Sequence, residues 1–186
     1  MREFRQILEG LALEITTPRE MGLELEVEET GATFAENAAI KAGAFHQASG
    51  LLALADDSGL EVEALGNAPG VFSARYAGLP NGPEKNRHLL ARLASVPQEG
   101  RGCHYVCEIA IVDEGGRLHR CRGILEGLVA PEPRGRGGFG FDPIFLVPED
   151  GRTVAEMSDQ EKHRISHRGR AGRAAREILE RLLATV

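Results

Sequence analysis

The stretch "LLALADDSGLEVEAL", from Leu51 to Leu65, fixes the centre of the predicted fold. Its apolar start, up to Ala55, does not alternate, which is typical of a central strand covered on both faces. Asp56 and Asp57 follow, and Ser58 with Gly59 predicts a turn after them. Two carboxylates at the end of a buried strand repel each other and lose hydration. A lysine, a metal ion or a phosphate-bound cation is therefore expected near this strand.

Asp56 and Asp57 admit two interpretations. Neighbouring strand residues point to opposite faces, so a straight strand cannot send both carboxylates into one cavity. A turn at Ser58 and Gly59 lets one carboxylate face a site while the other supports it. Alternatively these residues form only a surface turn, because Asp-Ser-Gly is common at strand ends.

The segment "TFAENAAIKAGAFHQASG", residues 33–50, predicts the clearest helix. Thr33 and Glu36 have the spacing of a capping box, and Gly50 is a suitable terminator. One helical stripe contains Phe34, Ala38, Lys41, Phe45 and Ala48. The face that should pack inward therefore includes one lysine.

Lys41 is either a snorkelling lysine or part of a site. Its helix leads through Gly50 directly into the strand that ends at the aspartates, where its ammonium could neutralise them or hold a phosphate. Glu29 precedes the helix and offers a further carboxylate. Magnesium takes one or two protein carboxylates and completes its shell with waters and phosphates. Acids with a lysine therefore suit a metal-bound nucleoside triphosphate.

The stretch "GGFGFDP", Gly137 to Pro143, combines glycines with two aromatic rings and an acid. A ring on a glycine loop can stack on a base. The alternative is a tight turn whose phenylalanines enter the core. Further along, "EKHRISHRGRA" offers Lys162, His167 and Arg168 as donors for a purine's oxygen edge and phosphates, or else a solvated basic patch.

The composition sets broad limits. The chain has 186 residues and a net charge of −6, which argues against a protein that coats a nucleic acid polymer. No run is long enough for a membrane span and no leader opens the chain, so we expect a cytoplasmic protein. Three cysteines fit reduced thiols. Cys103, Cys107, Cys121 and nearby histidines could bind zinc, but packing on strand faces fits their spacing better.

The remaining segments complete an α/β prediction with a mixed central sheet and flanking helices. Helices are expected at residues 2–9, at about 169–183, and from Pro83 in a first turn to an end before Pro97. Strands are expected at 103–112 and 117–128, and strands or extended segments at 13–17 and 23–28. The last two strands flank "DEGG", which predicts a hairpin.

Four blocks in order carry a family resemblance: "ETGATFAENAAIKA", "ADDSGLEVEALGNAPGVFSARYAG", "GFGFDPIF" and "SHRGRA". Together they resemble the inosine/xanthosine triphosphate pyrophosphatase family, whose members cleave non-standard purine nucleoside triphosphates to monophosphate and pyrophosphate. The resemblance implies a single domain over residues 1–186, with two lobes and an active-site groove between them. It also implies Mg²⁺ as cofactor, a purine nucleoside triphosphate as substrate and a homodimer.

The resemblance also assigns roles to individual residues. Asp57 resembles the catalytic base and a metal ligand, Glu29 a second ligand, and Asp56 a supporting acid of the metal site. Lys41 resembles the lysine that contacts phosphate during catalysis. The implied substrate contacts are Ser58, Phe139, Gly140, Phe141, Asp142, Lys162, His167 and Arg168, with Phe139 as the stacking ring.

One departure bears on activity. Relatives begin with a strand and a Ser/Thr-x-Asn-x-x-Lys phosphate loop before a helix resembling "REFRQIL", and here Met1 lies at the start of that helix. The domain is therefore expected to lack this strand and loop. A non-catalytic nucleotide-binding relative that lost the phosphate loop is therefore an alternative, and a pyrophosphatase for other modified nucleotides is a separate one.

Overall fold

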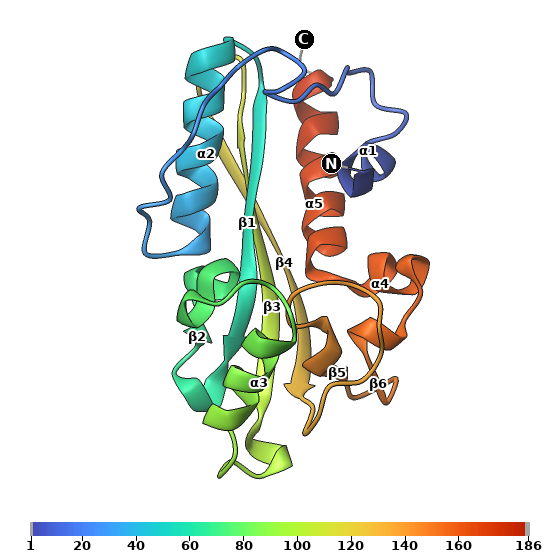
Figure 1. Ribbon diagram of the computed structural model, residues 1–186. Coiled ribbons are helices and arrows are strands. Elements are labelled where there is room, and N and C mark those ends of the chain that lie inside the picture. The colour runs from blue at the N-terminus through green and yellow to red at the C-terminus, as the bar shows by residue number, and fades with distance from the viewer. Residues whose placement is uncertain (1, 185–186) are drawn as a thin grey trace. The chain divides into compact units, whose positions relative to one another are not determined.

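The computed structural model describes the backbone of residues 2–184 and the side chains of residues 4–184. It has the α/β class that the sequence predicts, with helices and strands intermixed along the chain (Figure 1). Two compact units are present. The first unit contains Met1–Asp57, Cys107–Gly123 and Arg168–Val186, and the second contains Ser58–Val106 and Ile124–His167. Three strands are shared, because each passes from one unit into the other along the chain.

Among the described residues, the strands form one six-stranded sheet in the order β2-β1-β3-β4-β5-β6. Their bounds are β1 Ala53–Val62, β2 Ala68–Pro69, β3 Gly102–Val112, β4 Leu118–Val129, β5 Phe145–Val147 and β6 Arg152–Thr153. β1 pairs with β2, β4 with β5 and β5 with β6, each antiparallel. The helices are α1 Arg2–Ile7, α2 Phe34–Ser49, α3 Pro83–Arg92, α4 Asp159–Ile165 and α5 His167–Leu183.

Local signals set the ends of α2 as predicted. The Thr33 side chain accepts a hydrogen bond from the Glu36 N–H, and the Glu36 side chain accepts one from the Thr33 N–H. Gly50 ends the helix in the left-handed region at φ 69°. The two ends of α2 are therefore defined by local bonds, and the chain enters β1 three residues after Gly50.

In the first unit, α2 and α5 lie on the two sides of the strands (Figure 1). Alternation within β3 separates the two faces, since Ile109 and Ile111 pack in the cluster with α1 and α5, whereas Ala110 and Val112 pack with α2. The α2 side consists mainly of alanines, including Ala38 and Ala42. Small side chains let the helix come close to the sheet.

The second unit has its own core, in which residues of β1, β3, β4 and β5 pack with α3. Leu60, Leu89, Ile144 and Phe145 are each about 1% exposed or less. This core also takes up Phe141, a residue of the glycine-rich loop. The packing of Phe141 therefore fixes one side of that loop to the core.

One sequence prediction is wrong, and another is confirmed only in part. Residues 13–17 and 23–28, expected as strands or extended segments, are not strands, because a ladder needs a partner strand. Leu13 and Ile15 instead pack against the first unit's core as irregular chain. The predicted turn at Ser58 and Gly59 is also absent, because β1 continues through both residues.

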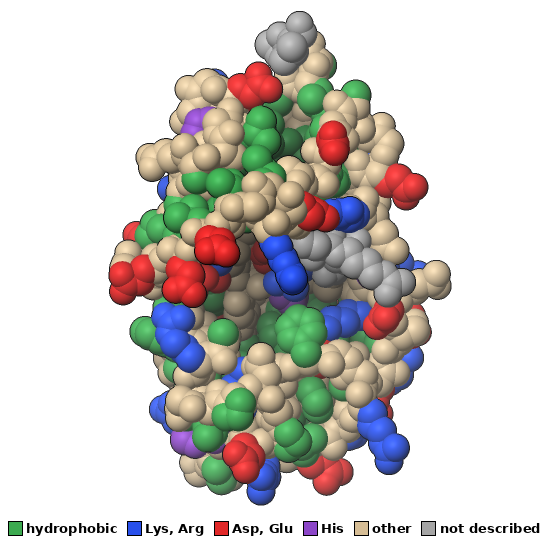
Figure 2. All heavy atoms as spheres, turned by 45° about the horizontal axis from the view of Figure 1, so that its top comes forward, with side chains coloured by type: hydrophobic (Ala, Val, Ile, Leu, Met, Phe, Trp, Pro, Cys, Tyr) green, Lys and Arg blue, Asp and Glu red, His purple; other side chains and the backbone are tan. Residues whose placement is uncertain are grey.

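The surface carries charged side chains of both signs, as expected from a sequence with 22 basic and 28 acidic residues. Lys and Arg side chains are mixed with Asp and Glu over the face seen in Figure 2, and apolar side chains reach the surface between them. Within residues 2–184, no helix has the length and apolar character that a membrane crossing requires.

Candidate active site

The alternation of β1 sends Asp56 and Asp57 to opposite faces of the first unit's strands. Ala55, two positions before Asp57, packs with α2, whereas Leu54, two before Asp56, packs in the cluster with α5. Asp57 therefore faces α2 and Asp56 faces α5. Because β1 continues through Ser58 and Gly59, the two carboxylates stay on opposite faces, as neighbouring residues of an uninterrupted strand do.

Asp57 belongs to a cluster with Glu29, Asn37 and Lys41, which we call the acid–lysine cluster. The Lys41 Nζ lies 2.8 Å from Glu29 Oε1 and 3.3 Å from Asp57 Oδ1. The Asn37 amide donates to the other Asp57 oxygen at 3.1 Å. Side-chain exposure is 18% for Lys41 and 13% for Asp57, so solvent reaches the cluster only in part. Lys41 is therefore ion-paired within the fold rather than snorkelling.

The environment of this cluster changes two pKa values. Burial alone would lower the pKa of Lys41, but the hydrogen bond to Glu29 and the charge of Asp57 raise it above its ordinary value. Burial is also the largest influence on Asp57 and raises the pKa of that carboxyl, against the lowering by Lys41 and Asn37. Lys41 thus keeps its charge at neutral pH, and Asp57 is a stronger base than an exposed aspartate.

Asp56 has a different partner. The Arg168 guanidinium lies at the start of α5 and contacts Asp56 Oδ2 through Nε at 3.2 Å and Nη2 at 2.9 Å. The Cys107 Sγ is 3.9 Å from the same oxygen. The structure therefore brings Glu29 and Asp57 together but does not bring Asp56 to them.

The carboxylates of Glu29 and Asp57 are suitable ligands for one hard cation. Glu29 and Asp57 already converge on one cationic point, the Lys41 ammonium, and carboxylate oxygens are the ligands that Mg²⁺ takes in proteins. Among residues 2–184 no group of three or more His, Cys, Asp and Glu side chains is arranged to hold a metal ion. A cation at Glu29 and Asp57 would thus complete its shell with water and ligand oxygens.

The second unit contains another cluster, built on Asp142 and here called the loop cluster. Asp142 is 3% exposed. Its Oδ2 receives the Lys162 ammonium at 2.6 Å and the Phe139 backbone N–H at 2.7 Å. The same ammonium lies 4.6 Å from the centroid of the Phe139 ring. Lys162 therefore joins helix α4 to the tip of the glycine-rich loop.

The two phenylalanines of this loop differ. Phe139 is 63% exposed, as a ring that stacks on a ligand must be. Phe141 is 3% exposed and packs its ring against Tyr76 and the Lys85 ammonium. Of the two interpretations of the loop, the structure supports the exposed ring for Phe139 and the core for Phe141.

The other predicted residues of the second unit are also described. Gly140 adopts φ 62°, and a Cβ added there would meet no atom within 4 Å. Ser58 is half-buried on β1. The His167 ring stacks on Tyr105 with centroids 4.7 Å apart. The sequence reasoning missed Asn37, which lies one turn before Lys41 on α2, and Tyr105, which the alternation of β3 places in the core.

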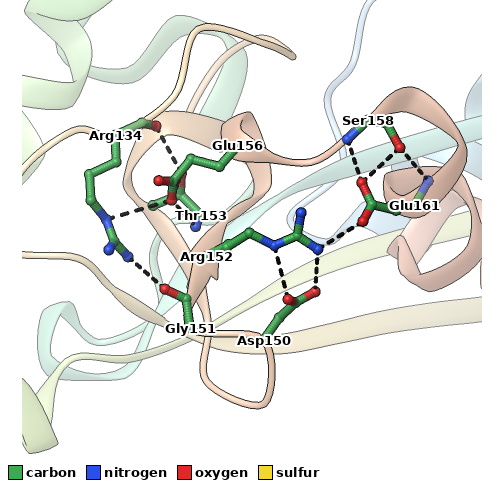
Figure 3. A network of polar contacts seen from close by, with 8 residues as sticks. All are labelled: Arg134, Asp150, Gly151, Arg152, Thr153, Glu156, Ser158 and Glu161. Atoms are coloured by element: carbon green, nitrogen blue, oxygen red, sulfur yellow. Dashed lines mark hydrogen bonds and ion pairs between the residues drawn. The ribbon is translucent and has the colours of Figure 1, made fainter.

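A polar network joins both the chain before the glycine-rich loop and helix α4 to residues 150–158 (Figure 3). The Arg152 guanidinium bonds Asp150 and reaches Glu161 at 2.8 Å. Glu161 also forms the capping box of α4 with Ser158, and these bonds lower its pKa to about 2. At the other end, Arg134 accepts a bond from Thr153 at 2.8 Å through its carbonyl oxygen. The chain before Phe139 and the helix carrying Lys162 are thereby anchored together.

These observations define a class, an α/β protein with a cluster of charged side chains in each of its two units. Known structures and sequences narrow this class. The structure is similar to a HAM1 protein from Coxiella burnetii, with a TM-score of 0.89 and 43% identity over 97% of this chain and 92% of that chain. It is also similar to a nucleoside-triphosphatase / dITP/XTP pyrophosphatase from Mycobacterium abscessus, with a TM-score of 0.79 and 41% identity over 94% and 92% of the two chains.

The model of the Ham1 family matches residues 1–178, and the chain belongs to this family. A dITP/XTP pyrophosphatase from Symbiobacterium thermophilum is 53% identical over 98% of this chain and 91% of that protein. Another dITP/XTP pyrophosphatase, from Desulforamulus reducens, is 47% identical over 98% and 91% of the two chains.

Proposed function

We propose that this protein hydrolyses non-standard purine nucleoside triphosphates (ITP, dITP and XTP) to the monophosphate and pyrophosphate. The observation that carries the proposal is the convergence of Glu29 and Asp57 on Lys41 in a chain of the Ham1 family. Relatives named dITP/XTP pyrophosphatase, at 41% to 53% identity, support the substrate class. The family resemblance further supports a homodimer that acts on free nucleotides in the cytoplasm.

The acid–lysine cluster supplies the groups for phosphoryl chemistry. Lys41 would stabilise charge on the phosphate oxygens, and Asp57, with its raised pKa, would orient and deprotonate the attacking water. Glu29 and Asp57 would hold Mg²⁺, which when bound withdraws charge from the phosphates. Asp56, which the family resemblance implies as a supporting acid, would hold Arg168 on the other face of the strand.

The loop cluster supplies groups for the base. Phe139 would stack on the purine, and Lys162 would donate to its O6. Asp142 would keep Lys162 in place, and His167 and Arg168 would contribute further donors. Adenine carries an amino group at the position of O6, which would leave the Lys162 donor unpaired. This arrangement favours hypoxanthine and xanthine over adenine.

Incubation with ITP and Mg²⁺ should release pyrophosphate, and a chelator should stop the reaction. We expect kcat/KM for ATP to be about 10²-fold lower than for ITP or more, because the half-buried Lys162 donor would face an amino group in place of O6. Ion chromatography of the products checks both points. Orthophosphate as the product would contradict the mechanism, and saturable binding of ITP without turnover would favour the non-catalytic alternative. A panel of modified nucleotides tests for other substrates.

Gly138→Ala should weaken nucleotide binding through the loop cluster. Gly138 has φ 70°, and a Cβ there would overlap the Asp142 carboxylate, with its Cγ only 2.8 Å away. We expect KM for ITP to rise about tenfold, as for loss of a bond to a charged group. Gly66→Ala is the matched control, because it carries similar strain at φ 63° but meets no atom within 4 Å. Equal KM values for the two variants would show that strain alone acts.

A further inference from the structure

We propose that Tyr105 is a positioning residue that fixes the carboxylate of Asp142 and the ring of His167. This inference rests on the proposed function, because it assigns a support to two of the proposed substrate contacts. Tyr105 lies on β3 and is 7% exposed. All residues in the argument belong to the second unit.

The hydroxyl of Tyr105 completes the surroundings of Asp142. It donates to Oδ1 at 3.1 Å, while Lys162 and the Phe139 N–H occupy Oδ2. The two oxygens thus have different partners. Without the tyrosine hydroxyl, Oδ1 would lose this bond, and the carboxylate, held by Lys162 and the Phe139 N–H through Oδ2, could turn about its Cβ–Cγ bond together with them. The hydrogen bond therefore sets the orientation of both groups that would meet the base.

The ring of Tyr105 has a separate role. It is stacked between Phe145, with centroids 4.4 Å apart and an interplanar angle of 10°, and His167, at 4.7 Å and 23°. Phe145 is 1% exposed and anchors this stack in the core. Aromatic pairs at such distances stabilise the folded protein by more than the burial of their apolar area alone. The stack therefore limits the tilt of the His167 ring.

The protonation of Tyr105 agrees with this role. Burial first, and then the charge of Asp142, raise the pKa of the phenol well above its ordinary value. The hydroxyl therefore keeps its proton at neutral pH and donates a hydrogen bond to the carboxylate.

Tyr105→Phe separates the hydroxyl from the ring. The variant keeps the stack and nearly the same volume but loses the bond to Asp142. We expect KM for ITP to rise about tenfold, as for the loss of a bond to a charged group, and kcat to stay within about twofold because the acid–lysine cluster is untouched. The preference for ITP over ATP should fall by a similar factor. Tyr105→Leu, which also removes the stack, should raise KM further.

Tyr76→Phe is the matched control. Tyr76 is 8% exposed in the same core, and its hydroxyl accepts a bond from Arg92 rather than contacting Asp142. The experiment measures kcat and KM for ITP and ATP by pyrophosphate release, together with thermal unfolding, for the wild type and each variant. The inference predicts a KM change for Tyr105→Phe that Tyr76→Phe does not reproduce.

The outcomes separate this inference from the proposed function. An unchanged KM in Tyr105→Phe, or a fall in kcat that follows a lowered unfolding temperature, would overturn the role of Tyr105 and leave the proposed function intact. A wild type that releases no pyrophosphate from any of ITP, dITP and XTP would overturn the proposed function and this inference with it.

Discussion

Asp57→Asn should reduce pyrophosphate release from ITP about 10³-fold or more, since a positioned general base contributes roughly 10²–10⁴-fold and this residue would also hold the metal. Asparagine has nearly the same shape and can still meet the Asn37 side chain, but it cannot accept a proton. The burial that raises the pKa of Asp57 disfavours its charge, so its neutral replacement should unfold at nearly the same temperature. The steady-state rate with ITP and Mg²⁺ is the measurement.

The control for Asp57→Asn is Glu114→Gln. Glu114 lies in the exposed turn between β3 and β4, and its replacement also removes one negative charge. This variant should keep the full wild-type rate, which separates the loss of a base from a change in net charge. Retention of more than about a tenth of the wild-type rate by Asp57→Asn would rule out Asp57 as the base.

The sequence predicted best where the signal was local. Thr33, Glu36 and Gly50 determine both ends of α2 through bonds within a few residues of each other. The strands of the β3–β4 hairpin were also predicted to within one residue at all four ends, because a short turn joins them.

Prediction failed where distant residues decide the structure. Gly59 was interpreted as a turn residue, yet it lies within β1 because another segment passes close by. A Cβ at Gly59 would lie 2.8 Å from the Gly70 carbonyl oxygen, and the neighbouring Leu60 N–H bonds the Ser73 hydroxyl at 2.9 Å. A glycine needed for space and a glycine needed for a turn look the same in a sequence.

The acid–lysine cluster was predictable because two independent patterns meet there. The helical stripe turned Lys41 inward, and the short link through Gly50 brought its helix beside β1. Tyr105 could not be found in this way. The alternation of β3 shows only that its ring is buried, and the partner of its hydroxyl, Asp142, lies far along the chain.

Lys41→Met should lower pyrophosphate release about 10²–10³-fold, the usual cost of losing one donor to a charged transition state. It should also destabilise the metal-free protein by about 2 kcal/mol, because Glu29 and Asp57 would face each other without a cation in a half-buried site. The pKa of Lys41 in the folded protein is raised above 10.5. The stabilisation is thus complete below pH 10.5 and is lost as the pH rises through the folded pKa.

Magnesium separates the two roles of Lys41. In Lys41→Met both carboxylates remain, so Mg²⁺ should raise the unfolding temperature of this variant more than that of the wild type, while the rate stays low. Arg87→Gln, which removes an exposed cation from α3, should change neither property. If Mg²⁺ stabilised the variant and the wild type equally, Glu29 and Asp57 would not be the metal ligands. The expected result, in which Mg²⁺ restores the stability of Lys41→Met but not its activity, would distinguish neutralisation of the carboxylates from the action of Lys41 on the phosphates.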